Sequence, residues 1–216
     1  MPSVTSARAA IEREVTLPPG YTLQWTGQYE FQLRARERLT LLLPIVFFII
    51  FMLLYITFHS TAEAAIVMLS VVFAMTGGAI LQWMLGYNFS VAVWIGYIAL
   101  YGVAVQTGVV MVVYLHEALD RRLAAGGTLT AADVLQATID GSVLRLRPKL
   151  MTVSVVMASL VPILWSAGVG ADVMKPIAAP IIGGMITSTI HVLNNIPTIF
   201  YMLKVRGLRQ ISAPTA

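Results

Sequence analysis

Long runs of apolar residues alternate with short polar connections along the chain after residue 38. An apolar run of about 20 residues is long enough to cross a bilayer as an α-helix. Runs of this kind predict five membrane spans, at about residues 39–58, 64–84, 90–114, 148–165 and 177–203. We therefore predict an all-α membrane protein whose transmembrane domain covers residues 39–204.

Proline and glycine positions within these runs predict how the spans bend and pack. Pro162 and Pro197 lack a backbone N–H donor and are expected to bend their helices, and the asparagines at 194–195 interrupt the fifth span further. The residues at 77–78 and 183–184 are glycine pairs, which let a neighbouring helix approach closely. We expect these pairs to pack helix against helix.

The one sizeable polar connection is residues 115–147, between the third and fourth spans. Thr130 and Asp133 have the spacing of a capping box, which begins a helix. Three apolar residues then define a short face: Val134, Leu135 and Ile139. We predict a short helix in this connection that lies along the cytoplasmic surface of the membrane, as amphipathic helices do.

The composition supports a lipid environment. Hydrophobic residues make up 58% of the chain and charged residues 11%, and the mean hydropathy is +0.81. A chain of 216 residues cannot enclose so much apolar surface in a soluble core, because surface shrinks slowly with size. The absence of cysteine excludes disulfides and thiolate metal sites, and the charged first 20 residues are not expected to form a signal peptide.

The position of the basic residues predicts membrane orientation rather than nucleic-acid binding. Lys and Arg gather on the cytoplasmic face of membrane proteins. The side that holds residues 115–147 and the tail 205–216 carries slightly more of them, which predicts a cytoplasmic C-terminus. Five arginines between residues 8 and 38 oppose this bias. The conflict disappears if the chain is the back end of a longer protein whose earlier helices set the topology.

Polar side chains at membrane depth are the natural candidates for function because burying them is costly. Gln106 lies near the middle of the third span, one turn after Gly102, and a simple interhelical hydrogen bond is one interpretation of it. Lys149 follows Pro148, a residue that favours the first position of a helix. Its amine either reaches out to the lipid headgroups or points inward to carboxylates on another helix, where it can exchange a proton.

The residues do not support an enzyme or a resident cofactor. His116-Glu117 lacks a second histidine at the spacing that a zinc-protease helix requires, and no G-x-S-x-G nucleophile motif occurs. His59 and His191 are scattered, so a closed zinc site is not expected. His191 is instead expected to join the asparagines at 194–195 in a polar cluster.

The segments LRLRPKLMT and VPILWSAGVGADVMKPIAAPIIGGMIT resemble the end of a heavy-metal efflux permease of the resistance–nodulation–division (RND) superfamily, of the copper/silver or cobalt/zinc/cadmium type. LPPGYTLQWTGQYEF resembles the last strand and exit helix of its periplasmic domain, so residues 1–38 are expected to be the end of that domain. The five spans then correspond to the last five of the family's twelve.

This resemblance implies proton-driven antiport of a heavy-metal cation by a homotrimer in the bacterial inner membrane. A periplasmic adaptor and an outer-membrane channel are the implied partners. Lys149 matches a relay lysine that pairs with a glutamate of the third span and with an aspartate in the first half of the permease. Gln106 replaces that glutamate, and the aspartate lies outside this chain. Met174, in the outer-side loop 166–176, matches a metal-passing methionine, and methionine sulfur suits a soft ion such as Cu(I).

We therefore expect the C-terminal membrane portion of a heavy-metal cation efflux permease, incapable of transport without the N-terminal half. Two alternatives stay open on the sequence: a fragment of a multidrug-type RND permease, and a non-transporting membrane scaffold or remnant.

Overall fold

The computed structural model describes residues 10–11, 13–14, 28–124 and 130–212. The chain divides into two units, residues 1–43 and 44–216, and each is described by itself. In the first unit, Arg34 pairs with Glu30 one helical turn earlier. The described elements of both units are helical, in agreement with the predicted all-α class.

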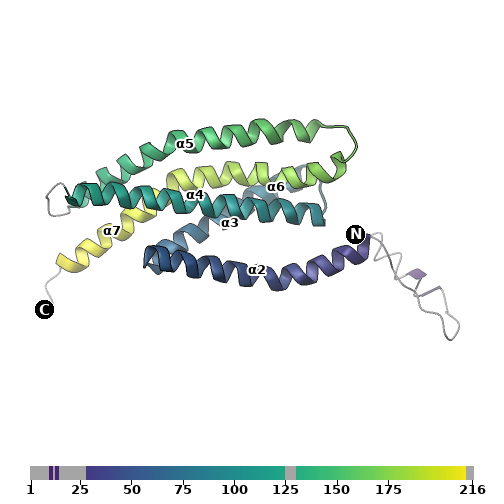
Figure 1. Ribbon diagram of the computed structural model, residues 1–216, viewed down its shortest axis with the longest axis horizontal. Helices are drawn as coiled ribbons and strands as arrows, with labels where there is room; N and C mark the ends of the chain where they lie inside the picture. The colour runs from purple at the N-terminus through teal and green to yellow at the C-terminus, as the bar shows by residue number, and fades with distance from the viewer. Residues whose placement is uncertain (1–9, 12, 15–27, 125–129, 213–216) are drawn as a thin grey trace. The chain divides into compact units, whose positions relative to one another are not determined.

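Five helical stretches of the described chain are long and apolar enough to cross a membrane, which confirms the predicted number of spans. The helices are α2 (Gln28–Phe58), α3 (Thr61–Met84), α4 (Val91–Ala124), α5 (Ala131–Trp165), α6 (Ala171–Ile190) and α7 (Ile196–Ser212), with a short π-helix, η1 (His191–Asn195), between α6 and α7. Helices α3, α4 and α6 pack against one another, and α5 runs along α4 and α6 (Figure 1).

Glycine pairs form a close helix crossing between α3 and α6. A Cβ atom on Gly77 would collide with Thr187 and with the carbonyl oxygen of Gly183, and one on Gly183 would collide with the carbonyl oxygen of Gly77. A Cβ on Gly184 would overlap Leu100 of α4. The predicted packing role of both pairs is confirmed, because only hydrogen side chains let the backbones come this near.

The α4–α5 connection is shorter than the sequence suggested. The capping box is confirmed: the Thr130 hydroxyl accepts from the Asp133 amide at 3.3 Å, and the Asp133 carboxylate accepts from the Thr130 amide at 3.0 Å. The helix that begins there does not stop, however. It continues through Pro148 to Trp165, so Pro148 lies inside α5 rather than at a first helical position. Neighbouring helices let a membrane helix tolerate an internal proline.

The buried face of the first half of α5 differs from the apolar face that the sequence predicted. Val134 is buried, but Leu135 and Ile139 are each 46% exposed. The buried face instead follows the helical repeat through Val134, Ala137, Thr138 and Gly141. A Cβ on Gly141 would lie 3.0 Å from the carbonyl oxygen of Tyr114, so α4 packs against the side that carries Gly141, and Leu135 and Ile139 lie outside this contact.

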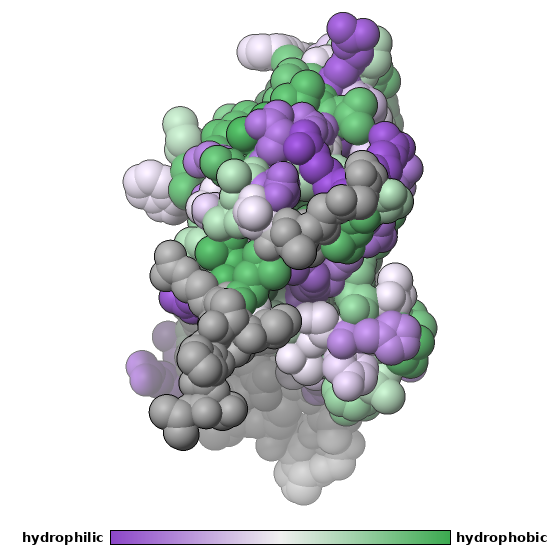
Figure 2. Space-filling model, turned by 90° about the vertical axis from the view of Figure 1, so that its left-hand side faces the viewer, coloured by the Kyte–Doolittle hydropathy of each residue, from purple (hydrophilic) through white to green (hydrophobic). Residues whose placement is uncertain are grey.

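Hydrophilic side chains gather at the end of the second unit where α4 meets α5 (Figure 2). Arg122 near the end of α4 bonds Asp140 of α5 at 3.0 Å there. Glu117 and Arg121 form a second ion pair one turn apart on α4, at 2.6 Å. This polar end contrasts with the apolar flanks of the helices.

The fifth predicted span is a composite of α6, η1 and α7. Pro197 has no N–H to donate to the carbonyl four residues earlier, and the helix widens into a π-turn just before it. Within that turn the Asn195 amide lies 2.9 Å from Nδ1 of His191, which confirms the predicted polar contact. The buried His191 ring also stacks on Phe73 of α3, with the ring centroids 4.1 Å apart.

The helices differ sharply in how much of their membrane-length segment is covered. Within the described chain, 44% of that segment is buried in α3 and in α4, and 67% in the α6–α7 stretch, but only 6% in α5. The spanning half of α5 therefore leaves most of its surface open.

Candidate functional site

The side chain of Lys149 lies inside the helical bundle. It is 2% exposed and is one of the largest fully buried side chains of the described chain. Its amine donates to the hydroxyl oxygen of Thr107 on α4, at 3.1 Å. Thr107 donates its own proton to the carbonyl of Val103 at 2.6 Å, which leaves the hydroxyl lone pairs to face the lysine. The structure thus favours the inward orientation of Lys149 over the headgroup-facing one.

The described surroundings of Lys149 contain no negative partner. Among the residues that the structure describes, no carboxylate forms an ion pair with its amine. Arg145 sits one turn earlier on α5, with its guanidinium 5.6 Å from the centre of the Tyr114 ring and its buried Nε without a described partner. A buried ammonium held by one neutral hydrogen bond, next to a second cation, is costly. This site is therefore electrostatically incomplete.

Gln106 does not meet Lys149 in this chain. Its side chain is exposed, whereas the next residue, Thr107, is buried and makes the contact. Gly102, one turn before Gln106, is also exposed, and a Cβ there would meet nothing within 4 Å. No described helix of this chain uses the close approach that Gly102 permits, so this face of α4 is free for a helix from outside the chain.

Met174 lies in the first turn of α6, not in a loop, because the helix begins at Ala171 after Gly170 adopts a left-handed conformation (φ 88°). The Met174 side chain is 52% exposed. Among the described residues, no group of three or more His, Asp or Glu side chains is placed to hold a metal ion.

Sequence reasoning missed two features of the polar interior. One is Thr107, whose only sequence signal is a hydroxyl next to the intramembrane amide of Gln106. The other is a charged cluster of Glu63, His116 and Lys204, in which Lys204 bonds Glu63 at 2.8 Å across 141 residues of sequence. Its signal was an acid at the start of the second predicted span and a base at the end of the fifth, on the same side of the membrane.

Comparison with known proteins finds similar efflux proteins by sequence and by structure. The family model of the AcrB/AcrD/AcrF family matches residues 2–204. The cation efflux system protein CusA of Escherichia coli K12 is 43% identical over 202 residues, which are 93% of this chain and 19% of CusA. The nickel and cobalt resistance protein CnrA of Cupriavidus metallidurans is 36% identical over 196 residues, 91% of this chain and 17% of CnrA.

A solved structure matches as well. The crystal structure of a heavy-metal efflux pump superposes with a TM-score of 0.72 at 32% identity, covering 93% of this chain and 19% of the pump chain. The chain therefore spans roughly a fifth of the length of the relatives that it matches.

Proposed function

The chain belongs to the AcrB/AcrD/AcrF family, as part of a heavy-metal RND permease, and from this premise we propose that it is the C-terminal membrane portion of a proton-driven cation efflux transporter. It would export a heavy-metal cation from the bacterial inner membrane as the membrane subunit of a tripartite system. We further propose that it transports only when the N-terminal half of the permease is present.

The buried amine of Lys149, which bonds Thr107 and has no counter-charge among the described residues, carries this proposal. An ammonium at this depth needs a counter-charge, and a lysine can also release its proton when that counter-charge changes. Arginine is unsuited to such a role because it stays protonated. Lys149 is therefore the proton-carrying group of this half, and Thr107 is its resting partner. The carboxylates that would complete the relay come from helices outside this chain.

The open surfaces of the bundle support a partner half. Lys149 points inward from α5, yet the described chain leaves most of the remaining surface of the spanning part of α5 uncovered. The Gly102–Gln106 face of α4 is uncovered too. We propose that helices of the N-terminal half cover both surfaces and bring an acidic side chain to Lys149. Trimer formation and contact with a periplasmic adaptor and an outer-membrane channel would then follow for the complete permease.

The membrane orientation in this proposal places the α4–α5 connection and the tail after residue 204 in the cytoplasm. The basic residues support this orientation, since Arg121 and Arg122 are in the last turn of α4, directly before the connection. Met174, at the start of α6, then faces the periplasmic side. Its exposed thioether is our proposed contact for the exported cation on this half.

A two-plasmid complementation experiment tests the proposal. A metal-sensitive bacterial strain would express this chain alone, the N-terminal half of a related cation permease alone, or both together, with the adaptor and the channel. We expect metal tolerance to rise only in the strain that expresses both halves. Tolerance in the strain with this chain alone, or no tolerance with both halves although they co-purify, would contradict the proposal.

The glutamine at position 106 gives a second test in the same strain. Gln106→Glu adds a carboxylate to the exposed face of α4, next to the residue that holds Lys149. A carboxylate can carry a proton and an amide cannot, so we expect cation-driven proton flux through the assembled permease to rise. The measurement is proton uptake in vesicles with a pH-sensitive dye. Unchanged flux would show that position 106 does not take part in the relay, and lower flux would contradict the expected gain.

A further inference from the structure

A second charged cluster lies at the polar end of the bundle and joins three helices. Glu63 is in the first turn of α3, His116 near the end of α4, and Lys204 in α7. The Lys204 amine lies 2.8 Å from Oε1 of Glu63, and Nε2 of His116 lies 3.3 Å from the same oxygen. The Glu63 side chain is only 5% exposed, so this is a buried carboxylate with two basic neighbours.

The hydrogen-bond partners of His116 identify the atom that is free to bind a proton. Its Nδ1 lies 3.2 Å from the backbone carbonyl of Val112, an acceptor, so Nδ1 carries the hydrogen of the neutral ring. Nε2 then holds a lone pair, which accepts from the Lys204 amine at 3.3 Å. In this state Nε2 and Glu63 Oε1 are two acceptors that face each other without a hydrogen bond.

Protonation of Nε2 reverses these contacts. The ring then donates to Glu63, and it no longer accepts from Lys204, because the lone pair is used. Glu63 can accept the new bond without losing Lys204, since its Oε2 has no hydrogen-bond partner among the described residues. A proton on His116 therefore replaces a link between α4 and α7 with a link between α4 and α3.

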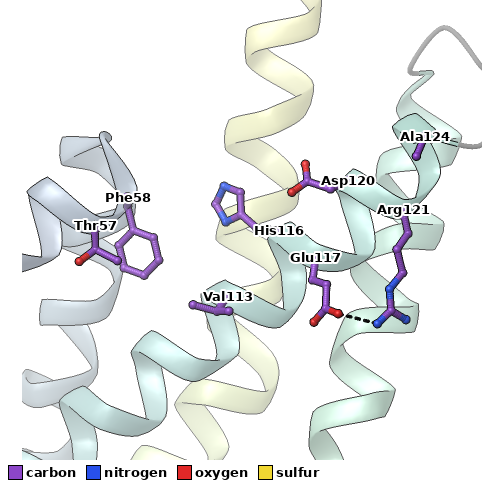
Figure 3. Close-up of a pocket in the computed structure, with 8 residues that line it drawn as sticks. All are labelled: Thr57, Phe58, Val113, His116, Glu117, Asp120, Arg121 and Ala124. Atoms are coloured by element: carbon purple, nitrogen blue, oxygen red, sulfur yellow. Dashed lines mark hydrogen bonds and ion pairs between the residues drawn. The ribbon is translucent and has the colours of Figure 1, made fainter.

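A cavity of about 590 Å³ lies beside His116, whose side chain is 31% exposed. It lies between the end of α2 and α4, and Figure 3 shows the His116 and Phe58 rings facing each other across it. The charged groups near His116 are Glu63 from α3, Lys204 from α7, and Glu117, Asp120 and Arg121 from its own helix. The α2 residues that line the cavity, Thr57 and Phe58, do not titrate in the physiological range. Glu117 is turned toward Arg121, to which it bonds (Figure 3).

We propose that Nε2 of His116 is a proton-binding site, filled from this cavity, that exchanges the hydrogen bond of Lys204 for one to Glu63. The site is separate from Lys149. It goes beyond the proposed function, and the binding of the proton itself does not depend on transport. In a working permease, this site would make the contacts between α7 and the rest of the bundle depend on the protonation of His116.

Nitrogen NMR of the histidine rings tests this assignment on the full chain in lipid nanodiscs. The sample carries ¹⁵N-histidine, and the His116→Gln variant identifies the His116 signals among the three histidines. At high pH we expect the neutral tautomer with hydrogen on Nδ1. On lowering the pH, Nε2 should gain the proton with a single midpoint.

Two variants with opposite expected effects make the test specific. Glu63→Gln removes the negative charge that faces the protonated ring, and we expect the His116 midpoint to fall by about one pH unit, which is roughly a tenfold loss of proton affinity. Lys204→Met removes the competing cation and should raise the midpoint. The control is Glu117→Gln, which removes the same charge from a residue that lines the cavity beside His116 but bonds Arg121. Its shift should be smaller than that of Glu63→Gln.

In the unsubstituted chain, a neutral His116 ring with its hydrogen on Nε2 would overturn the proposal. This result does not depend on whether the variants fold. A midpoint that Glu63→Gln leaves unchanged, or that Glu117→Gln lowers as much, would also overturn it. None of these readouts requires metal transport, so a failure of the efflux proposal and a failure of this one are told apart.

Discussion

Replacing Lys149 with methionine is expected to abolish metal tolerance in cells that supply the remaining half of the permease. Methionine fills a similar space in the bundle but cannot carry a proton, and the hydroxyl of Thr107 loses its donor. We expect the inhibitory metal concentration to fall to that of cells without the permease. The measurement is growth against metal concentration, with the amount of permease in the membrane checked by immunoblot.

Two further variants separate proton transfer from charge alone. Lys149→Arg keeps the positive charge but does not release a proton, so tolerance should be lost in this variant as well. Arg206→Met removes one positive charge from an exposed position of α7 and should leave tolerance intact. Full tolerance in the methionine or arginine variant of Lys149 would mean that its amine takes no part in transport.

The second large effect is expected at the α3–α6 crossing. Gly183→Ala places a methyl group against the backbone of Gly77 and within 2.7 Å of the Leu81 Cβ, where neither atom is the flexible end of a side chain. The two helices must move apart, and we expect a loss of about 3 kcal/mol in the unfolding free energy. Unfolding of the chain by SDS in mixed micelles, followed by circular dichroism, measures this change.

The same substitution at Gly102 is the matched control. A Cβ there meets nothing within 4 Å, and alanine is the better helix former by about 1 kcal/mol. Gly102→Ala should therefore leave stability unchanged or slightly higher. Equal destabilisation by both variants would show that the loss at Gly183 comes from the helix backbone and not from the crossing.

The spans were predictable because the signal for them is local. An apolar stretch has to be long enough to cross the bilayer, and that length can be counted along the chain. The start of α5 was predictable for the same reason, since the Thr130–Asp133 box involves residues only three apart. The glycine pairs predicted close packing, but the partner of Gly77 could not be read from the sequence because Gly183 is distant along the chain.

The extent and the buried face of α5 were not predictable from local pattern. Proline is frequent at the first position of a helix, so Pro148 looked like a helix start. The packing of neighbouring helices lets α5 run through it. Leu135 and Ile139 are the most apolar residues of the first turns, yet the structure buries the smaller Ala137 and Gly141 where α4 comes close. Small residues are buried where two helices come close, and the hydrophobicity of a helix does not show which of its faces makes such a contact.

The site was predictable only in part. Lys149 was identified as a candidate, but its sequence position fits an outward amine as well as an inward one. The contact with Thr107 decides the direction, and it depends on how α4 and α5 are rotated against each other. The Glu63–Lys204 pair depends on the arrangement of the second and fifth spans, so no local pattern contains it. The RND resemblance of the quoted segments is confirmed by the family match and by the matched pump structure.

The central claim, that the Lys149 amine lies inside the bundle and not in the headgroup layer, is tested most directly by amine labelling. The chain has lysine only at positions 149, 175 and 204, so mass spectrometry can assign each labelled amine. A charged, water-soluble amine reagent is added at neutral pH to the chain in lipid nanodiscs, where it reaches both faces of the bilayer. We predict that Lys175 is labelled and that Lys149 stays unlabelled while the helices are folded. Equal labelling of Lys149 and Lys175 would contradict the account.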